Sequence, residues 1–262
     1  MRVGFAKKRF EKQQDEFFKI SEDNDVVPAV FDVPDFRDLR VGAAVVDDNF
    51  KLPEKTRNWE LSQRHATDQG KTSMRCSAYG TETAKGVMDS AELGRPIYHN
   101  ADQLWEHQLK TGASEERGDS IQNVLKNLRK HGFVTSGKQY NVTETRRLTD
   151  KSLRALMLWL ALRKTVVTGI YVRKDDGYVT NYRRAEFNPY GTLKISRGQI
   201  IGGHLQACVD YETRNDGVWF FFPNTYGKSW GSADGGVWVH QSEINHTMSK
   251  YIIFDARDDY KR

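Results

Sequence analysis

The period of the hydrophobic pattern changes once along this chain, near residue 165, and no other feature constrains the fold as much. Before that point apolar residues recur at helical spacing, as in the stretch from Ile121 to Leu128, which follows the cap candidates Asp119-Ser120. After it, β-branched and aromatic runs such as Thr165–Val172 are separated by turn residues, which is typical of strands. Helices that precede strands, without alternating with them, predict an α+β fold.

The same patterns give approximate bounds for the elements. We expect helices at Cys76–Leu93, from Ile121 through Lys130 and His131 with Gly132 as the stop, and from Leu148 or Thr149 to Leu162. Gly80 and Gly86 disfavour an unbroken helix over Cys76–Leu93. The predicted strands are Thr165–Val172, His204–Tyr211, Val218–Phe222, Val237–His240 and Tyr251–Phe254.

The first 50 residues differ from the rest. A charged stretch, Ala6–Lys12, opens a pattern that predicts a helix continuing to Ile20, and Pro28 and Pro34 then favour extended chain. We therefore divide the chain into an N-terminal extension, residues 1–50, and a main domain, residues 51–262.

Composition excludes several classes of protein. The net charge of +5 comes from basic residues scattered as short pairs, so no concentrated basic stripe predicts nucleic-acid binding. The apolar run Ala155–Leu162 is too short to cross a bilayer, and no secretory signal precedes the domain. We expect a soluble protein with no membrane partner. The two cysteines, Cys76 and Cys208, are too few for a disulfide framework, which predicts free thiols and a reducing compartment.

A cysteine stands at the predicted start of a helix, shortly after a glutamine. The free N–H groups and dipole of a helix N-terminus stabilise a thiolate at Cys76. The side-chain amide of Gln69 and the backbone N–H of Cys76 can supply two donors to the negative oxygen that forms when a thiolate attacks a peptide carbonyl. Taken alone, a cysteine on an apolar helix face is more often buried filler, which is also our interpretation of Cys208 in its apolar strand.

A histidine and an asparagine follow in the strand-rich part. Gly203 precedes His204 and leaves room for a substrate backbone to approach the imidazole. The side-chain oxygen of Asn224 can accept from the imidazole N–H and fix its tautomer. Each residue alone has an ordinary structural interpretation, as a strand histidine or a turn asparagine.

The order of these residues, glutamine and cysteine, then histidine, then asparagine, resembles the papain family of cysteine peptidases from about Leu52 to Phe254. The resemblance implies a two-lobed fold, with a helical left lobe, an antiparallel β-sheet or barrel as right lobe, and the active site at the seam. It implies hydrolysis of peptide or protein substrates by a Cys76-His204-Asn224 triad with a Gln69-assisted oxyanion hole, and no cofactor. The segments that carry it are Leu52-Pro53, Asn58-Trp59, Asp68-Gln69-Gly70, Cys76-Ser77-Ala78-Tyr79, Gly118–Gly132, Thr165–Tyr171, Gly203-His204, Asn224–Trp230 and Gly235–Val239.

Some residues depart from the family pattern. Met74-Arg75 precede the cysteine where the family usually has Gly-Ser, and Ser77 follows it where the family has an aromatic residue. Arg75 either favours the thiolate or obstructs the cleft. The loop from Gln69 to the cysteine is one residue longer than usual, and Tyr226 stands where a tryptophan commonly shields the histidine–asparagine bond. Lower activity or unusual specificity is the expected consequence.

The resemblance also assigns residues to substrate contact. Gly118 remains of the glycine pair that contacts substrate backbone, with Asp119 beside it, and Gly203 and Trp230 complete the expected set. No metal is expected, because the spacing of His240, Glu243 and His246 matches no familiar zinc pattern and suits surface residues.

Two classes of function remain open at this point. One is peptide hydrolysis; the other is a papain-fold structural or binding component of a viral particle, with little or no turnover. The extension, residues 1–50, is a prosegment, an anchor to a virion or other protein partner, or additional packing on the domain. Family members are often secreted with a leader and disulfides, and this chain shows neither feature, so we expect a cytoplasmic or, if phage-encoded, a virion location.

Overall fold

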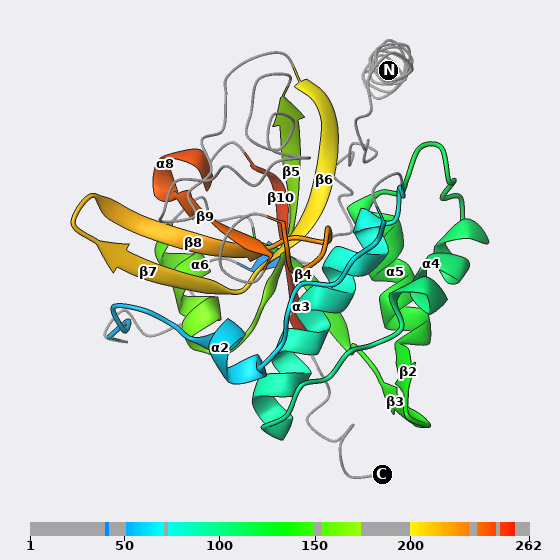
Figure 1. Ribbon diagram of the computed structural model, residues 1–262, viewed down its shortest axis with the longest axis horizontal. Coiled ribbons are helices and arrows are strands. Elements are labelled where there is room, and N and C mark those ends of the chain that lie inside the picture. Colours follow the sequence, from blue (N-terminus) through cyan, green and yellow to red (C-terminus); the bar gives the residue numbers. More distant parts are fainter. Residues whose placement is uncertain are drawn as a thin grey trace.

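The computed structural model describes residues 40–41, 51–70, 73–148, 153–173, 200–230, 235–244 and 247–254. The helix expected at Ala6–Ile20 and the extended stretch around Pro28 and Pro34 lie outside these residues. Figure 1 shows α3 (Cys76–Leu93) in the middle of the molecule, α4 (Ala101–Leu109) and α5 (Ile121–His131) on one side of it, and most strands, together with α6 (Leu153–Ala161) and α8 (Gln241–Ile244), on the other. None of the described helices has the length and apolar character that crossing a membrane requires.

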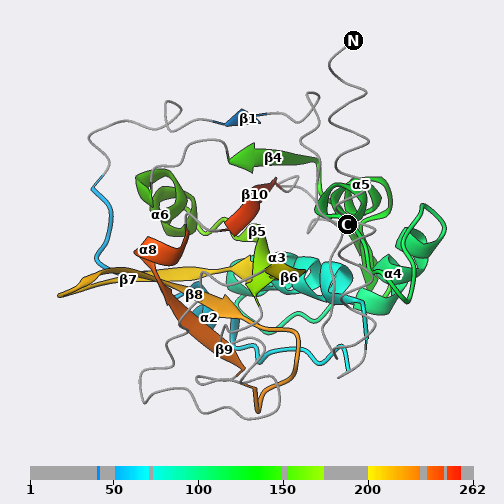
Figure 2. The same ribbon diagram turned by 90° about the horizontal axis from the view of Figure 1, so that it is seen from above.

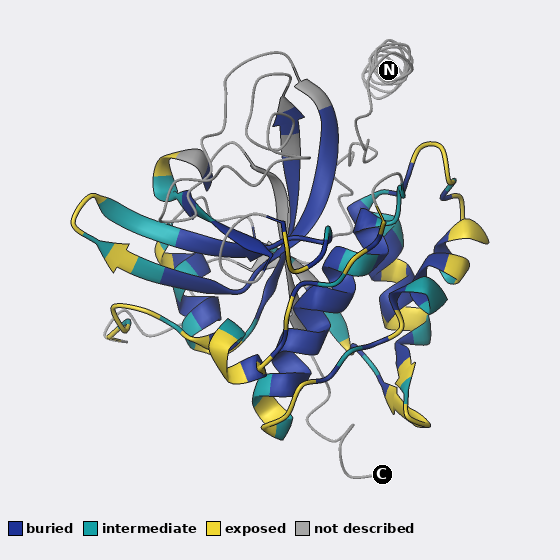
Figure 3. Cartoon of the chain, in the orientation of Figure 1, coloured by how far each residue is buried: buried dark blue, intermediate teal, exposed yellow. Residues whose placement is uncertain are grey.

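The helical side consists of α2 (Asn58–Ser62), α3 (Cys76–Leu93), α4 (Ala101–Leu109) and α5 (Ile121–His131). Most of α3 is buried, as the dark ribbon in Figure 3 shows. The helix is unbroken despite Gly80 and Gly86. Gly80 has a packing role, because a Cβ atom at this position would come within 2.6 Å of the Leu205 carbonyl oxygen. Glycine therefore allows α3 to lie directly on the strand that carries Leu205.

Local capping explains the bounds of α5. Ser120 is its N-cap, and its side-chain oxygen accepts from the backbone N–H of Asn123 at 3.1 Å. Gly132, at φ +61°, ends the helix and donates its N–H to the Leu128 carbonyl at 2.8 Å. Both ends agree with the prediction. The sequence analysis missed α4, which Asn100 caps, and the hairpin of β2 (Phe133–Thr135) and β3 (Lys138–Tyr140).

A five-stranded sheet forms one layer of the other side, in the order β1-β4-β10-β5-β6. Its strands are β1 (Arg40–Val41), β4 (Glu144–Leu148), β5 (Val166–Arg173), β6 (Ile200–Cys208) and β10 (Thr247–Phe254). Only β1 pairs in parallel, with β4, at the edge of the sheet opposite β6. Figure 2 shows this edge from above. Two residues of the predicted extension thus belong to the sheet of the main domain.

The third predicted helix corresponds to α6, which spans Leu153–Ala161. Leu148, the earlier of its two expected starts, is instead the last residue of β4 and pairs with Val41 of β1. Its backbone finds partners in the sheet, and this tertiary pairing outweighs the helical pattern at that residue. Residues 149–152, which include the other expected start, lie outside the described part.

The second sheet has three antiparallel strands, β7 (Asp210–Arg214), β8 (Gly217–Pro223) and β9 (Gly236–His240), followed by the short helix α8 (Gln241–Ile244). We expected one strand from His204 to Tyr211, and the structure divides it at Val209. The N–H of Val209 donates to the Phe221 carbonyl at 3.1 Å, so the chain leaves the first sheet and enters the second there.

A buried carboxylate fixes the start of α2 against the second sheet. Asp210 accepts from the Thr56 hydroxyl at 2.7 Å and from the backbone N–H groups of Asn58 and Trp59 at 2.6 and 2.9 Å. Burial nevertheless raises the pKa of Asp210 from 3.8 to about 6. The folded protein therefore holds this proton more tightly than the unfolded chain does.

The stability that Asp210 contributes should fall as pH rises. It is fully present below pH 3.8 and is lost as pH rises through about 6. In Asp210→Asn this part of the pH dependence disappears, an effect of about 2–3 kcal/mol between the two limits. Urea unfolding of both proteins from pH 4 to 7 measures it, and parallel stability curves for the two would contradict the prediction.

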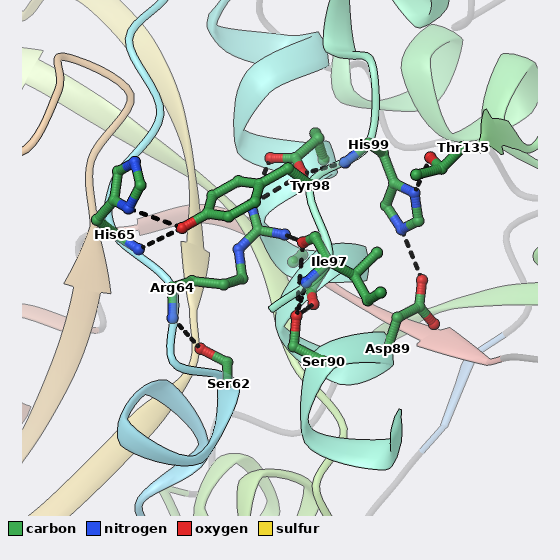
Figure 4. Close-up of polar contacts among 12 residues, drawn as sticks. Ser62, Arg64, His65, Asp89, Ser90, Ile97, Tyr98, His99 and Thr135 are labelled. Atoms are coloured by element: carbon green, nitrogen blue, oxygen red, sulfur yellow. Dashed lines mark hydrogen bonds and ion pairs between the residues drawn. The ribbon is translucent and has the colours of Figure 1, made fainter. Parts of the chain in front are cut away.

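A chain of buried charges ties α3 to the loop that precedes α4 (Figure 4). The guanidinium of Arg64 forms two hydrogen bonds of 2.8 Å with the Glu82 carboxylate, and both side chains are fully buried. The same Arg64 donates to the Ile97 carbonyl, and Glu82 accepts from the His99 backbone N–H at 2.9 Å. Because each charge has a partner of opposite sign or a hydrogen bond, the cost of burying the pair is offset.

The chain of charges continues to the hairpin. The Asp89 carboxylate lies 2.6 Å from the Lys85 ammonium and 2.6 Å from the His99 ring, and the other ring nitrogen of His99 meets the Thr135 hydroxyl at 2.8 Å. Phe133 stacks on the same ring with centroids 4.7 Å apart. These contacts hold β2 and its neighbouring loop against the far end of α3.

Candidate active site

Cys76 is the first residue of α3, and its side chain is 1% exposed. The thiol lies within hydrogen-bonding range of the backbone of Leu205 on β6, the residue after His204. Burial raises the pKa of Cys76 to about 11, although hydrogen bonds from the backbones of Leu205 and Ser77 act to lower it. The first turn of α3 therefore meets β6 at the position of the predicted base.

His204 and Asn224 form a direct hydrogen bond. The distance from His204 Nε2 to Asn224 Oδ1 is 2.7 Å, and both side chains are buried. The same Oδ1 accepts from the backbone N–H of Thr225 at 2.8 Å, so it acts as an acceptor and His204 Nε2 carries the proton. Nδ1 is then the basic nitrogen. Burial lowers the pKa of His204 to about 4, and the hydrogen bond to Asn224 acts in the opposite direction.

The segment that carries Gln69 runs antiparallel to the one that carries Asn224. The N–H of Gln69 donates to the Thr225 carbonyl at 2.8 Å, and the N–H of Gly227 donates to the Thr67 carbonyl at 2.9 Å. The Gln69 side chain accepts from the Thr225 hydroxyl at 2.5 Å and donates to the Ser73 carbonyl at 2.7 Å. One amide hydrogen of Gln69 is thus engaged within its own loop.

Tyr226 covers the imidazole of His204. The rings are stacked, with centroids 5.2 Å apart and planes inclined by 13°, and Trp230 packs edge-on against Tyr226 at 6.0 Å. Trp230 is itself buried, so it supports the Tyr226 ring from behind. Tyr226 therefore lies in the position that shields the histidine from water.

Removing this ring should weaken the site. Tyr226→Ala loses a stacked contact of about 0.5–1.5 kcal/mol and admits water to the histidine–asparagine bond, so we expect roughly a three- to tenfold lower kcat/KM. Tyr226→Trp keeps an aromatic face and should retain most activity. Steady-state hydrolysis of a peptide substrate by both variants is the measurement, and equal rates for alanine and tryptophan would argue against a shielding role.

The residues predicted to contact substrate are placed differently from one another. Gly118, at φ +76°, forms a bridge with Ser114 just before α5. The carboxylate of Asp119 is directed into the protein, where it accepts from Gln108. Gly203 is buried within β6. Substrate contact by these residues and by Trp230 stays a prediction.

Arg75, the residue before the predicted nucleophile, is paired with carboxylates of the helical side. Its guanidinium forms ion pairs with Asp102 on α4 at 2.9 Å and with Glu115 at 3.1 Å. The indole N–H of Trp105 also donates to Glu115, at 2.8 Å. The two carboxylates neutralise the arginine and fix its direction along the helical lobe, so its side chain braces the turn before α3.

Sequence reasoning missed the residues that support the site from behind. Thr225, next to Asn224, links the asparagine and glutamine segments through its hydroxyl and both backbone groups. Gln108 lies under the first turn of α3 and donates to Ser77 at 2.7 Å. No spacing rule connects a glutamine of α4 with the nucleophile, so a single sequence carries no signal for it.

The described residues contain no group of three or more histidine, cysteine, aspartate or glutamate side chains that could hold a metal ion. The ring nitrogens of His240 meet the Ser242 hydroxyl at 2.9 Å and the Asp216 carbonyl at 3.1 Å. The Glu243 side chain and His246 lie outside the described part. Cys208 is fully buried in the hydrophobic core.

Comparisons with known proteins find their matches among solved structures. Xylellain, a cysteine protease from Xylella fastidiosa, matches with a TM-score of 0.68 at 18% identity, over 88% of this chain and 96% of that one. Procathepsin B S9 from Trypanosoma congolense matches with a TM-score of 0.69 at 15% identity, over 90% and 88%. The ragweed pollen cysteine protease Amb a 11, in its proform, matches at 0.63 and 17%, over 80% and 67%. No family model and no curated protein sequence matches the chain. The likeness establishes the two-lobed α+β fold of papain-like proteases that the sequence predicted.

Proposed function

We propose that this chain is a papain-like cysteine peptidase in which Cys76 is the nucleophile, His204 the general base and acid, and Asn224 the residue that orients the imidazole. The observation that carries the proposal is the 2.7 Å bond from His204 Nε2 to Asn224 Oδ1, made where the first turn of α3 meets β6. The likeness to solved cysteine proteases supports it.

The chemistry follows from the tautomer. Because Asn224 holds the proton on Nε2, Nδ1 of His204 accepts the thiol proton as Sγ attacks the substrate carbonyl. The imidazolium then returns that proton to the leaving amine, and the carbon–nitrogen bond breaks to leave a thioester. Water, deprotonated by the same nitrogen, releases the acyl group as a carboxylic acid and restores the thiol. The Gln69 amide and the Cys76 N–H are the proposed donors to the oxyanion.

The reacting side chains are closed off in this structure. Cys76 is 1% and His204 is 2% exposed, and their pKa values, about 11 and about 4, keep both neutral near pH 7. A substrate carbonyl must reach Sγ, so turnover requires the site to open. Opening readmits water, which brings the two pKa values back toward their ordinary range and favours the thiolate–imidazolium pair.

The role of residues 1–50 remains a proposal tied to this opening. Several structural neighbours are proforms, which favours a prosegment. Pairing of Arg40–Val41 with β4, opposite the edge that carries His204, favours packing for that short part. A site-specific protease sequence inserted between Asn49 and Phe50 tests the alternatives. A prosegment predicts that cutting raises activity, whereas unchanged activity leaves packing or an anchor.

Labelling with a thiol-directed epoxide tests the proposed nucleophile directly. The probe should modify Cys76 and not Cys208, which is fully buried in the core and serves as an internal control. Peptide mapping of the labelled protein identifies the site. Failure to label Cys76 both before and after the cut at Asn49 would oppose the peptidase proposal and favour a binding or structural module, including a virion component.

A further inference from the structure

Three buried polar side chains connect the first turn of α3 with the start of α5. The side-chain amide of Gln108 donates to the Ser77 hydroxyl at 2.7 Å and also to the Asp119 carboxylate. Asp119 accepts from the backbone N–H of Ser120 at 2.7 Å, and the Asn123 amide lies 3.0 Å from each carboxylate oxygen. Ser77 and Gln108 are fully buried and Asp119 is 6% exposed.

The orientation of the Gln108 amide is determined by this network. Its nitrogen meets two acceptors, while its oxygen, Oε1, has no hydrogen-bond partner within the described part of the chain. Rotating the amide by half a turn would place that oxygen against the Asp119 carboxylate, which would repel it. Gln108 is therefore locked by Asp119, and it holds Ser77, the residue next to the nucleophile.

The buried carboxylate of Asp119 lowers the stability of the fold, which is unusual for a residue with a purely structural role. Burial raises its pKa, and the groups that act to lower it are neutral donors from Gln108, Asn123 and the backbone. A buried carboxylate without a cation costs folding free energy that an asparagine or an apolar residue would not cost. Its charge also acts on Cys76, where it adds to the effect of burial in raising the thiol pKa.

We propose that Asp119 is a positioning residue of the peptidase reaction, which fixes the first turn of α3 through Gln108 and Ser77 and holds a buried carboxylate on the network that reaches the residue next to Cys76. This proposal rests on the proposed function for its catalytic meaning, but the effect on the thiol itself does not require turnover.

The direction in which Asp119 shifts the pKa of the Cys76 thiol depends on the other titratable and charged groups near Cys76. They include the titratable His204 on β6, whose ring is neutral at its lowered pKa, and Arg75, whose charge is met by Asp102 and Glu115. Among the described residues no cation forms an ion pair with Asp119, whose partners are the neutral donors of Gln108, Asn123 and the Ser120 backbone. Its negative charge therefore disfavours the thiolate, and its removal should make the thiol a stronger acid.

The experiment compares thiol titration and hydrolysis in the full-length protein and its variants. The ultraviolet absorbance of the Cys76 thiolate is followed against pH, with Cys76→Ala subtracted to remove other contributions. Asp119→Asn should raise the acid ionisation constant of the thiol roughly three- to tenfold and move the acidic limb of the kcat/KM profile to lower pH by the same factor. Glu106→Gln, an exposed residue of α4, carries the same charge change and should alter neither.

A second variant keeps the test sharp if Asp119→Asn folds poorly. Gln108→Leu preserves the carboxylate but removes its link to Ser77, so kcat should fall with little change in KM. A thiol titration unchanged in Asp119→Asn would overturn the inference, as would a Gln108→Leu enzyme with normal kcat. Absence of hydrolysis in every protein, together with a shifted titration, would instead count against the proposed function and leave the electrostatic coupling in place.

Discussion

Replacing Cys76 by alanine is expected to abolish hydrolysis, with a loss of at least about a thousandfold in kcat, because the covalent route disappears with the sulfur. The side chain is buried at the end of a helix where alanine fits, so the fold should persist. Cleavage of a general protein substrate, followed on gels and by released amines, is the measurement.

Cys208→Ala is the matched control, since it removes the other thiol of the chain from a fully buried position in β6. Its stability should fall by a cavity-sized amount while kcat stays within about twofold of the parent value. Equal activity of Cys76→Ala and the parent would contradict the assignment of Cys76 as nucleophile. A large loss of activity in Cys208→Ala alone would indicate that Cys208 is the reacting thiol.

The largest effect on stability is expected for Glu82→Gln. The substitution keeps the shape of the side chain but leaves the buried Arg64 guanidinium without its carboxylate, which typically costs about 3–5 kcal/mol. Denaturant unfolding at neutral pH measures the loss. Because the same carboxylate accepts from the His99 N–H, the loop before α4 should loosen first, as faster hydrogen exchange at that amide would show.

Two comparisons separate the buried pair from ordinary surface charge. Glu60→Gln breaks an exposed pair with Arg57, at 3.5 Å, and should cost less than about 1 kcal/mol. Replacing Arg64 and Glu82 together by leucine should cost less than Glu82→Gln alone, because no charge is then left unpaired. If Glu82→Gln were as stable as the parent protein, water would have to reach the Arg64 guanidinium and solvate its charge.

Local sequence signals sufficed where local chemistry decides structure. Ser120 and Gly132 mark both ends of α5, and the β-branched run at Val166 marks a central strand. They failed where pairing with a distant segment decides: Leu148, one of the two expected starts of a helix, ends β4 because it pairs with Val41, and Val209 divides a continuous apolar run because its N–H donates to the Phe221 carbonyl. Both partners lie in other parts of the chain, beyond any window of periodicity.

The site was predictable only through resemblance. Nothing in the residues around His204 or Asn224 alone implies that they meet, since each has a commoner structural role; the order of motifs along the chain supplied that link. The sequence showed which residues depart from the family pattern, but not which side chains those residues contact. The sequence left open whether Arg75 favours the thiolate or obstructs the cleft, and it gave no sign of the ion pairs that the arginine forms with Asp102 and Glu115.

His204 lies in β6 of the five-stranded sheet, and Asn224 directly follows β8 of the three-stranded sheet, so one side-chain bond links the two sheets. Any slippage of one layer over the other breaks that bond before either layer loses its own pairing. On gentle heating the protein should therefore lose the downfield proton resonance of the His204 ring N–H while its circular dichroism still reports intact helices and strands.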